Sequence, residues 1–234
     1  MKAAIIAGGF GKRLRPLTLE KPKPLVEVAG KPIIQWQIEW FKRYGVDTIV
    51  VLTGYLREKI IEFLGSGQKL GVNVVYVVED EPLGTAGAIK NAEGVLSDSV
   101  FLAVNGDIIT NIPLDKLVND LIKSDALASI ALVPLRSPYG IVEVDSEGNV
   151  KSFKEKPMIE EYLINAGVYA MKPQILHYLP RKCDLERSVF PQLAKEGLLR
   201  GVIFKDVYWR AIDTVKDVEE VSKELSSKNI WGSK

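Results

Sequence analysis

The 234-residue chain contains very little cysteine, histidine or net charge. Its one cysteine, Cys183, excludes an intrachain disulfide, and no zinc-type cysteine cluster is present. Its one histidine, His177, leaves little material for histidine pairs or for Ser-His or Cys-His catalysis. A net charge of +1 implies no strong attraction to nucleic acid or to an anionic membrane surface.

Long apolar runs are also missing, because no stretch approaches the roughly 18 residues of a membrane span. The N-terminus resembles a strand and lacks the charged region of a signal peptide, so we expect a cytoplasmic protein. Hydrophobic residues make up 47% of the chain, which is enough for a substantial core. The length suits one large domain or two small ones.

Strand-like and helix-like segments alternate through the first half of the chain. The expected strands are 3–7, 48–53, 72–78, 100–104 and 127–133, and the expected helices are 33–44, 55–64, 85–96 and 114–124. Repeated β-α units of this length predict an α/β fold with a mostly parallel, doubly wound, Rossmann-like sheet. Ligands then bind beyond the carboxyl ends of the strands.

The second half of the chain has shorter elements. We expect strands at 139–144 and 150–154 around the turn 146–149, and further strands at 165–171, 202–204 and 208–212. A helix is expected at 184–196, with Asp184 as its N-cap, and a closing helix at 216–226. We interpret this half as a lid or small subdomain on the same sheet, so that one domain covers 1–234 with halves at 1–134 and 135–234.

A glycine-rich loop follows the first strand. Gly8, Gly9 and Gly11 break the apolar run, and consecutive bare amides of this kind form a concave anion site. Arg13 and Lys23 can add full positive charges, so the loop predicts binding of a polyphosphate. It lacks the Ser/Thr of a P-loop and the third glycine of a Rossmann fingerprint. An ordinary glycine loop with solvated cations is the alternative.

A second polar turn, Asn105-Gly106-Asp107, follows the fourth expected strand. Its place at the carboxyl end of a parallel strand puts it in the same crevice as the glycine loop. A carboxylate there can hold Mg²⁺, which prefers few protein carboxylates together with substrate oxygens. A simple turn aspartate is the alternative, because Asn-Gly-Asp is good turn material.

The segments 7–18, 22–25 and 30–33 closely resemble the signature of sugar-1-phosphate nucleotidyltransferases. The resemblance covers nearly the whole chain and implies the nucleotide-diphospho-sugar transferase fold. It implies that the loop wraps the triphosphate of an incoming nucleotide. Arg13 then stabilises the leaving pyrophosphate and Lys23 contacts phosphate. The implied phosphate-binding residues of the loop are Ala7, Gly8, Gly9, Gly11, Lys12 and Arg13.

The resemblance also implies a Mg²⁺ site, with Asp107 as one ligand. The family usually supplies a second aspartate two residues after an aromatic, but Ala211 stands there after Trp209. Asp213 occupies the usual glycine position. Because alternate residues of a strand share a face, Asp213 can reach the same side as a displaced second ligand. Loss of that ligand is the alternative.

Residues 79–87 resemble the base-recognition loop of the family, and Gly84 and Thr85 match its nucleotide-binding positions. Glu79 stands where members that read uracil or thymine commonly have glutamine. A carboxylate only accepts hydrogen bonds, and guanine offers two adjacent donors, so Glu79 favours GTP. The alternative is an acidic surface loop, since Asp80 and Glu81 are adjacent. The glycines are expected to let the base lie flat on the backbone.

Three further motifs resemble the sugar side of the family. Gly140 permits close approach of a sugar hydroxyl, Glu155 and Asn165 can bind vicinal hydroxyls, and Lys156 can hold the sugar phosphate. The implied partners are therefore a nucleoside triphosphate and a sugar 1-phosphate, without nucleic acid or membrane. The resemblance allows a homo-oligomer. The second half of the chain, 135–234, is then expected to be a sugar-binding subdomain.

The implied reaction converts a nucleoside triphosphate and a sugar 1-phosphate to a nucleotide-sugar and pyrophosphate. We expect GTP with mannose 1-phosphate or a related manno-sugar such as a heptose. The alternatives are a uridylyl- or thymidylyltransferase for glucose 1-phosphate, and a non-catalytic nucleotide-sugar-binding regulator, which Ala211 keeps open. The chain ends at Lys234 without a hexapeptide repeat, so we expect no C-terminal left-handed β-helix.

Overall fold

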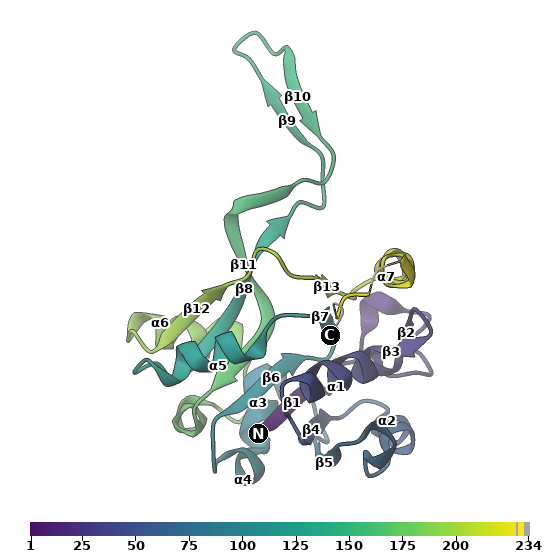
Figure 1. The fold of residues 1–234 in the computed structure, drawn as a ribbon, viewed down its shortest axis with the longest axis vertical. Coiled ribbons are helices and arrows are strands. Elements are labelled where there is room, and N and C mark those ends of the chain that lie inside the picture. The colour runs from purple at the N-terminus through teal and green to yellow at the C-terminus, as the bar shows by residue number, and fades with distance from the viewer. Residues whose placement is uncertain (228, 232–234) are drawn as a thin grey trace.

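A seven-stranded sheet forms the centre of the computed structural model, which describes residues 1–227 and 229–231 (Figure 1). Its strand order is β12-β8-β11-β6-β1-β4-β5. The strands are β1 (Lys2–Ala7), β4 (Thr48–Thr53), β5 (Asn73–Val78), β6 (Phe101–Asn105), β8 (Ala128–Arg136), β11 (Met158–Met171) and β12 (Leu199–Ile203). All neighbours pair in parallel except β11, which is antiparallel to β6 and to β8. The predicted mostly parallel α/β sheet is confirmed.

Helices cover both faces of this sheet. They are α1 (Ile33–Arg43), α2 (Arg57–Leu64), α3 (Gly84–Asn91), α4 (Glu93–Leu96), α5 (Leu114–Ile122), α6 (Phe190–Lys195) and α7 (Val215–Ser227). Side chains alternate along β1, so Ile5 packs in the cluster that holds the apolar faces of α1 and α5. Ala4, on the other face, packs with residues of α3 and α6. The sheet is therefore doubly wound. The helices leave the carboxyl ends of its strands open, which is where ligands bind in such sheets.

Two predicted helices differ from the observed ones. The helix expected at 85–96 is divided at Ala92 into α3 and α4. The helix expected at 184–196 begins with a wide π turn, Leu185–Val189, before α6. The Phe190 amide bonds the Leu185 carbonyl five residues back, and Pro191, which has no N–H group, follows directly. Asp184 makes no side-chain cap there, because its carboxylate accepts a 3.4 Å hydrogen bond from the amide of Thr85.

Three small two-stranded sheets complete the fold. They are β2 (Glu27–Val28) with β3 (Lys31–Pro32), β7 (Ile108–Thr110) with β13 (Trp209–Ala211), and β9 (Ile141–Val144) with β10 (Val150–Lys154). The β7–β13 pair matters most for the site, because it returns the C-terminal segment to the strand that follows β6. No helix within the described residues is long and apolar enough to span a bilayer.

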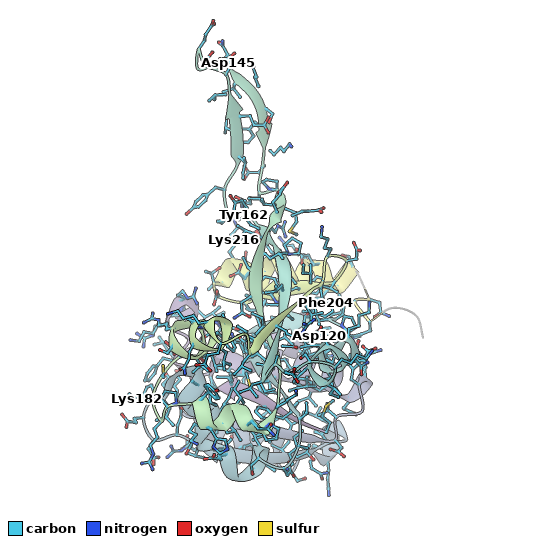
Figure 2. The ribbon with its side chains drawn as sticks, turned by 90° about the vertical axis from the view of Figure 1, so that its left-hand side faces the viewer. Asp120, Asp145, Tyr162, Lys182, Phe204 and Lys216 are labelled. Carbon is cyan, nitrogen blue, oxygen red and sulfur yellow. The ribbon has the colours of Figure 1, made fainter. Side chains whose placement is uncertain are left out.

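The β9–β10 hairpin projects from the body of the domain (Figures 1 and 2). Figure 2 shows Asp145 near its tip and Tyr162 near its root. The carboxylate of Asp145 accepts hydrogen bonds from the amides of Glu147 and Asn149, at 3.0 and 2.9 Å, which closes the predicted turn. One face of the hairpin carries apolar side chains that remain exposed: Val142, Val144, Val150 and Phe153.

Candidate active site

The glycine-rich loop after β1 folds tightly on itself. Gly11 has a φ of +60°, which places it in the left-handed region that favours glycine. The buried hydroxyl of Thr18 donates a 2.8 Å hydrogen bond to the Gly11 carbonyl. A Cβ at Gly11 would lie 3.0 Å from Thr18 Cγ2 and 3.1 Å from Lys23 Cβ. The loop therefore brings the short 3₁₀ turn that contains Arg13 against the turn that contains Lys23.

The Asn105-Gly106-Asp107 turn lies beside this loop, because β6 and β1 are parallel neighbours. The amide of Gly106 donates a 2.9 Å hydrogen bond to the Ile6 carbonyl. On the other side, the buried side chain of Gln37 donates to the carbonyls of Asn105 and Ile108, both at 2.9 Å. Helix α1 thus holds both ends of the turn, and the position of Asp107 is fixed from the core.

The C-terminal segment contributes the third wall. Ala211 pairs with Ile108 in the β13–β7 ladder, and the amide of Ile212 donates to the carbonyl of Asp107 at 2.9 Å. A capping box then starts α7: the amide of Thr214 donates to Asp217 Oδ2 at 2.7 Å, and the amide of Asp217 donates to Thr214 Oγ1 at 3.3 Å. Asp213 lies between these two restraints, so its side chain is held beside Asp107.

Four charged side chains meet where the three walls join. The ammonium nitrogen of Lys23 lies 2.7 Å from Asp107 Oδ2 and 2.8 Å from Asp213 Oδ1. Arg13 Nη2 lies 2.9 Å from the same oxygen of Asp213. The Lys23 side chain is only 15% exposed, whereas that of Arg13 is 72% exposed. An inner cation therefore bridges two carboxylates, and an outer cation remains accessible to a ligand.

A cavity of about 330 Å³ contains this cluster. It collects most of the residues that the sequence predicts for phosphate and metal binding: Ala7, Gly9, Gly11, Lys12, Arg13, Lys23, Thr85, Asp107 and Asp213. Gly8, Glu79 and Gly84 are not among its lining residues. The structure thus brings residues from four separate parts of the sequence to one hollow at the carboxyl ends of β1 and β6.

The two carboxylates in the cavity fit a divalent cation, because they already converge on the Lys23 ammonium. Across 1–227 and 229–231, no group of three or more His, Cys, Asp and Glu side chains could hold a metal. Two carboxylates and further oxygens from a substrate are the ligands typical of Mg²⁺. Of the two positions left open by the sequence, Asp213 reaches this point, and Ala211 lines a neighbouring cavity.

Glu79, at the end of β5, turns its carboxylate toward the glycine-rich loop. A Cβ at Gly8 would lie 2.1 Å from Glu79 Oε1, and a Cβ at Gly54 would lie 2.8 Å from its Cγ. Glycine at both positions is therefore needed for the close approach. Glu79 Oε2 is buried and has no hydrogen-bond partner within the described part of the chain. Burial raises the pKa of Glu79, and a hydrogen bond from the Leu83 backbone opposes that shift.

The acidic neighbours of Glu79 behave differently. Asp80 pairs with Arg57 at 3.1 Å and Glu81 pairs with Lys182 at 2.6 Å, and both acidic side chains are exposed. They form the solvated acidic surface that the sequence offered as the alternative for the whole loop. Glu79 is set apart from them by its burial and by the unpartnered oxygen.

The glycines of the 79–87 loop have a role that the sequence did not predict. A Cβ at Gly84 would lie 2.5 Å from the Cys183 carbonyl oxygen, and one at Gly87 would lie 2.5 Å from that of Arg181. The amides of Ala86 and Gly87 donate to the Cys183 carbonyl at 2.9 and 3.2 Å. These glycines therefore allow the backbone of Arg181 and Cys183 to pack closely against the loop, and the Cys183 carbonyl accepts hydrogen bonds from amides in the first turn of α3.

The predicted sugar-side residues do not share one cavity. Gly140 and Glu155 meet at the root of the hairpin, where a Cβ on Gly140 would lie 3.0 Å from Glu155 Oε2. Lys156 lines a second cavity of about 610 Å³, together with Trp209 and Ala211 of β13. Asn165 lies on β11 and is absent from the lining of both cavities.

The 610 Å³ cavity continues the site along β13, since Ala211 lines it and Asp213 lines the smaller one. Arg210 in its wall pairs with Glu220 at 2.9 Å and with Glu224 at 3.2 Å. The hydrogen bond from Arg210 lowers the pKa of Glu220. The Trp209 indole donates to the Ala166 carbonyl at 2.7 Å, which ties this wall to β11.

Sequence reasoning missed two polar residues that support the site. Gln37 could have been noticed, because an amide between the apolar positions Ile34, Ile38 and Phe41 of one helix needs buried partners. Glu186 gave no such signal, because it lay within a predicted helix. In the structure its carboxylate accepts hydrogen bonds from Thr85 and from Tyr169.

Comparisons with known proteins agree with this arrangement. A family model described as nucleotidyl transferase matches residues 2–228. A mannose-1-phosphate guanyltransferase of Yarrowia lipolytica is 40% identical over 228 residues, covering 93% of this chain and 62% of that protein. A UTP–glucose-1-phosphate uridylyltransferase of Synechocystis is 32% identical over 250 residues, covering 98% and 64%.

A solved structure of HddC from Yersinia pseudotuberculosis, complexed with GMP-PN, superimposes with a TM-score of 0.74. It is 27% identical, and the match covers 96% of this chain and 99% of HddC. The chain spans just under two thirds of the length of the two curated relatives, 62% and 64%. Its sequence match over residues 2–228 and its sheet topology lead to one conclusion: the chain belongs to the nucleotidyl transferase family.

Proposed function

We propose that the protein transfers a nucleotidyl group from a nucleoside triphosphate to a sugar 1-phosphate and releases pyrophosphate. The observation that carries the proposal is the 330 Å³ cavity, where the glycine-rich loop, Arg13, Lys23, Asp107 and Asp213 meet. Loop amides and two cations suit a polyphosphate, and the paired carboxylates suit the cation that accompanies it.

The chemistry requires alignment of two polyanions rather than a general base. An oxygen of the sugar phosphate attacks the α-phosphorus, and the bond from that phosphorus to the departing pyrophosphate breaks. The second pKa of a phosphate monoester is about 6, so the nucleophile is already ionised at neutral pH. In this proposal Arg13 meets the charge on the departing pyrophosphate, and Lys23 holds a phosphate oxygen.

We further propose Asp107 and Asp213 as the residues that hold Mg²⁺. When bound, the metal would neutralise phosphate oxygens and help to orient them in line. The carboxylates must then release Lys23, which now bridges them at 2.7 and 2.8 Å. The released ammonium is then free to pair with a phosphate oxygen of the substrate. Exchange of partners at Lys23 therefore accompanies substrate binding.

GTP is the nucleotide we favour. Glu79 holds an unpartnered, buried carboxylate oxygen, and its side chain lies against Gly8 and Gly54. A carboxylate accepts from both the N1–H and the N2–H₂ of guanine, whereas uracil offers only one donor on that edge. The Yarrowia relative is named a guanyltransferase and the HddC structure holds GMP-PN, which supports the same choice.

Mannose 1-phosphate, or a related manno-sugar phosphate, is the acceptor we favour. The 610 Å³ cavity next to the phosphate site offers Lys156 for the phosphate and the Trp209 indole as an apolar wall. Gly140 and Glu155 lie at the hairpin root and Asn165 lies on β11, and the family resemblance assigns all three to the same acceptor. Glucose 1-phosphate with UTP or dTTP is the second candidate, favoured by the Synechocystis relative.

A regulator that binds a nucleotide-sugar without turnover is the candidate from another class. Ala211 at the usual aspartate position favours it, whereas the contact of Asp213 with Lys23 counts against it. The deciding test measures pyrophosphate release with Mg²⁺ for GTP, UTP, dTTP, ATP and CTP, each with mannose, glucose and heptose 1-phosphates. We expect release with GTP and a manno-sugar. Release with no pair would overturn the proposal, and release with UTP or dTTP would move it to the second candidate.

A further inference from the structure

A series of hydrogen bonds links Thr85, in the predicted nucleotide loop, to Asn165, the residue predicted to bind the sugar. Thr85 Oγ1 donates to Glu186 Oε2 at 2.9 Å, and the Tyr169 hydroxyl donates to Glu186 Oε1 at 3.1 Å. Asn165 Nδ2 donates to the Tyr169 hydroxyl at 2.9 Å. Both carboxylate oxygens of Glu186 are therefore used, one toward each half of the molecule.

The chemistry of the groups fixes the direction of every bond. An ionised carboxylate can only accept, so Thr85 and Tyr169 must both donate their hydroxyl protons to Glu186. The Tyr169 oxygen, having given its proton, is left to accept from the Asn165 amide nitrogen. The Asn165 oxygen accepts in turn from the Gly167 amide at 2.9 Å. The orientation of the Asn165 amide is thus set from both ends.

Burial keeps these hydrogen bonds in the directions just described. Tyr169 is fully buried, and burial together with the charge of Glu186 raises the pKa of its hydroxyl well above the usual range. The hydroxyl therefore stays protonated and keeps donating. Thr85 is held at the other end, since its Oγ1 also accepts a 2.7 Å hydrogen bond from the Leu185 amide.

We infer that Glu186 is a positioning residue, which fixes Asn165 as a hydrogen-bond donor toward the acceptor substrate and couples it to Thr85 in the nucleotide loop. The second N–H of the Asn165 amide makes no hydrogen bond within the described residues and serves a sugar hydroxyl or phosphate oxygen. The assignment of that ligand as a sugar 1-phosphate rests on the proposed function. The coupling means that nucleotide binding at Thr85 alters the presentation of Asn165.

Glu186→Gln tests the inference with little change of shape. Glutamine brings a donor to one of two hydroxyls that now donate, so that hydroxyl must reverse. If Tyr169 reverses, its proton points at Asn165, whose amide must turn its N–H group toward the Gly167 amide. Tyr169→Phe removes the same link from the other side. Glu196→Gln, on the same segment but outside the link, is the matched control.

The first measurement needs no turnover. The side-chain amide signals of Asn165 in an ¹⁵N–¹H spectrum of the full chain are identified by their loss in Asn165→Ser. We expect them to move in Glu186→Gln and in Tyr169→Phe, and to stay in place in Glu196→Gln. GTP added without metal should shift them in the unmutated protein, and should not do so in Glu186→Gln or Thr85→Val. Unchanged signals in both Glu186→Gln and Tyr169→Phe, or the same GTP shift in all variants, would overturn the inference.

The second measurement separates the effect of each variant on KM from its effect on kcat. We expect Glu186→Gln and Tyr169→Phe each to raise the KM for the sugar 1-phosphate about tenfold, the scale of one lost hydrogen bond, with kcat within about threefold. The double variant should be no worse than either single variant. An unchanged KM, or a fall confined to kcat, would overturn the inference. If the unmutated protein turns over no substrate pair, the proposed function fails and the spectra alone decide the role of Glu186.

Discussion

Lys23 and Asp213 are 190 residues apart in the chain, yet the lysine ammonium lies 2.8 Å from Oδ1 of the aspartate. The same ammonium lies 2.7 Å from Oδ2 of Asp107. Lys23 therefore occupies the point that a divalent cation between these two carboxylates would take. The protein thus carries an internal cation between the two carboxylates that we propose as metal ligands, and a metal bound there would compete with it.

Lys23→Met should tighten the binding of Mn²⁺ to the free protein by about tenfold. Removing the ammonium leaves two adjacent carboxylates without a counter-charge, which favours a divalent cation. Turnover should fall at the same time, because the lysine no longer reaches phosphate. Titration calorimetry with Mn²⁺ gives the affinity, and Lys21→Met, whose lysine pairs with Glu27 on the surface, is the control. Equal or weaker Mn²⁺ binding in Lys23→Met would contradict the competition.

Arg13→Ala should lower kcat by about three orders of magnitude while the protein stays folded. In the proposed mechanism the arginine meets charge that grows on the departing pyrophosphate, and comparable arginines in phosphoryl transfer are worth about 10³ in rate. Its side chain is 72% exposed, so the fold should tolerate the loss. The measurement is pyrophosphate release at saturating substrates, with Arg15→Ala as the control. Near-normal turnover would remove Arg13 from the mechanism.

Asp107→Asn and Asp213→Ala should each raise the Mg²⁺ concentration needed for half-maximal rate, by tenfold or more. Both changes remove a charged ligand and leave the backbone restraints in place. Ala211→Asp should not rescue Asp213→Ala, because position 211 faces the larger cavity. The assay is turnover against Mg²⁺ concentration. A silent Asp213→Ala, together with a more active Ala211→Asp, would show a site with one protein ligand.

Glu79→Gln should narrow the preference for GTP over UTP and dTTP. In DNA readout a bidentate contact to a base edge is worth about 1–3 kcal/mol of discrimination, and we use that value as an order of magnitude. It corresponds to roughly a ten- to hundredfold preference for one base. The ratio of kcat/KM for the three triphosphates, with one sugar 1-phosphate, measures it. Asp80→Asn is the matched control on the exposed side of the loop. A preference of the unmutated protein for UTP would reverse the base assignment.

The same preference should depend on pH. Burial raises the pKa of Glu79, so acidification protonates it at a higher pH than an exposed glutamate. Its contribution to stability is present below the ordinary glutamate pKa and is lost as the pH rises through the raised value. The proposed contact of Glu79 with guanine needs the ionised form, so the affinity ratio of GTP to UTP should fall as the pH drops. The ratio cancels phosphate ionisation, and it should stay flat in Glu79→Gln.

The sequence was sufficient for features that depend on nearby residues. The strands at 48–53 and 150–154 have the predicted bounds, because apolar runs and turn signals are local. The glycine-rich loop and Asp107 also meet as predicted, since parallel strands end at one edge of a sheet. Asp213 could not be decided that way, because its place depends on the β7–β13 ladder and on the Thr214 cap. Glu186 was not predicted as a site residue, because its partners Thr85 and Tyr169 are distant from it in the chain.

Strand β11 changes surroundings along its length, and Asn165 marks the boundary. From Met158 to Leu163 it is largely exposed and pairs only with β8, whereas from Ala166 to Met171 it is buried, and Val168 to Met171 pair with β6 as well. Local opening costs less free energy where fewer contacts must break. Amide hydrogen exchange along this one strand should therefore be fast beside the hairpin and slow inside the sheet. Asn165, the residue predicted to bind the sugar, therefore lies at the boundary between backbone that is protected from exchange and backbone that opens locally.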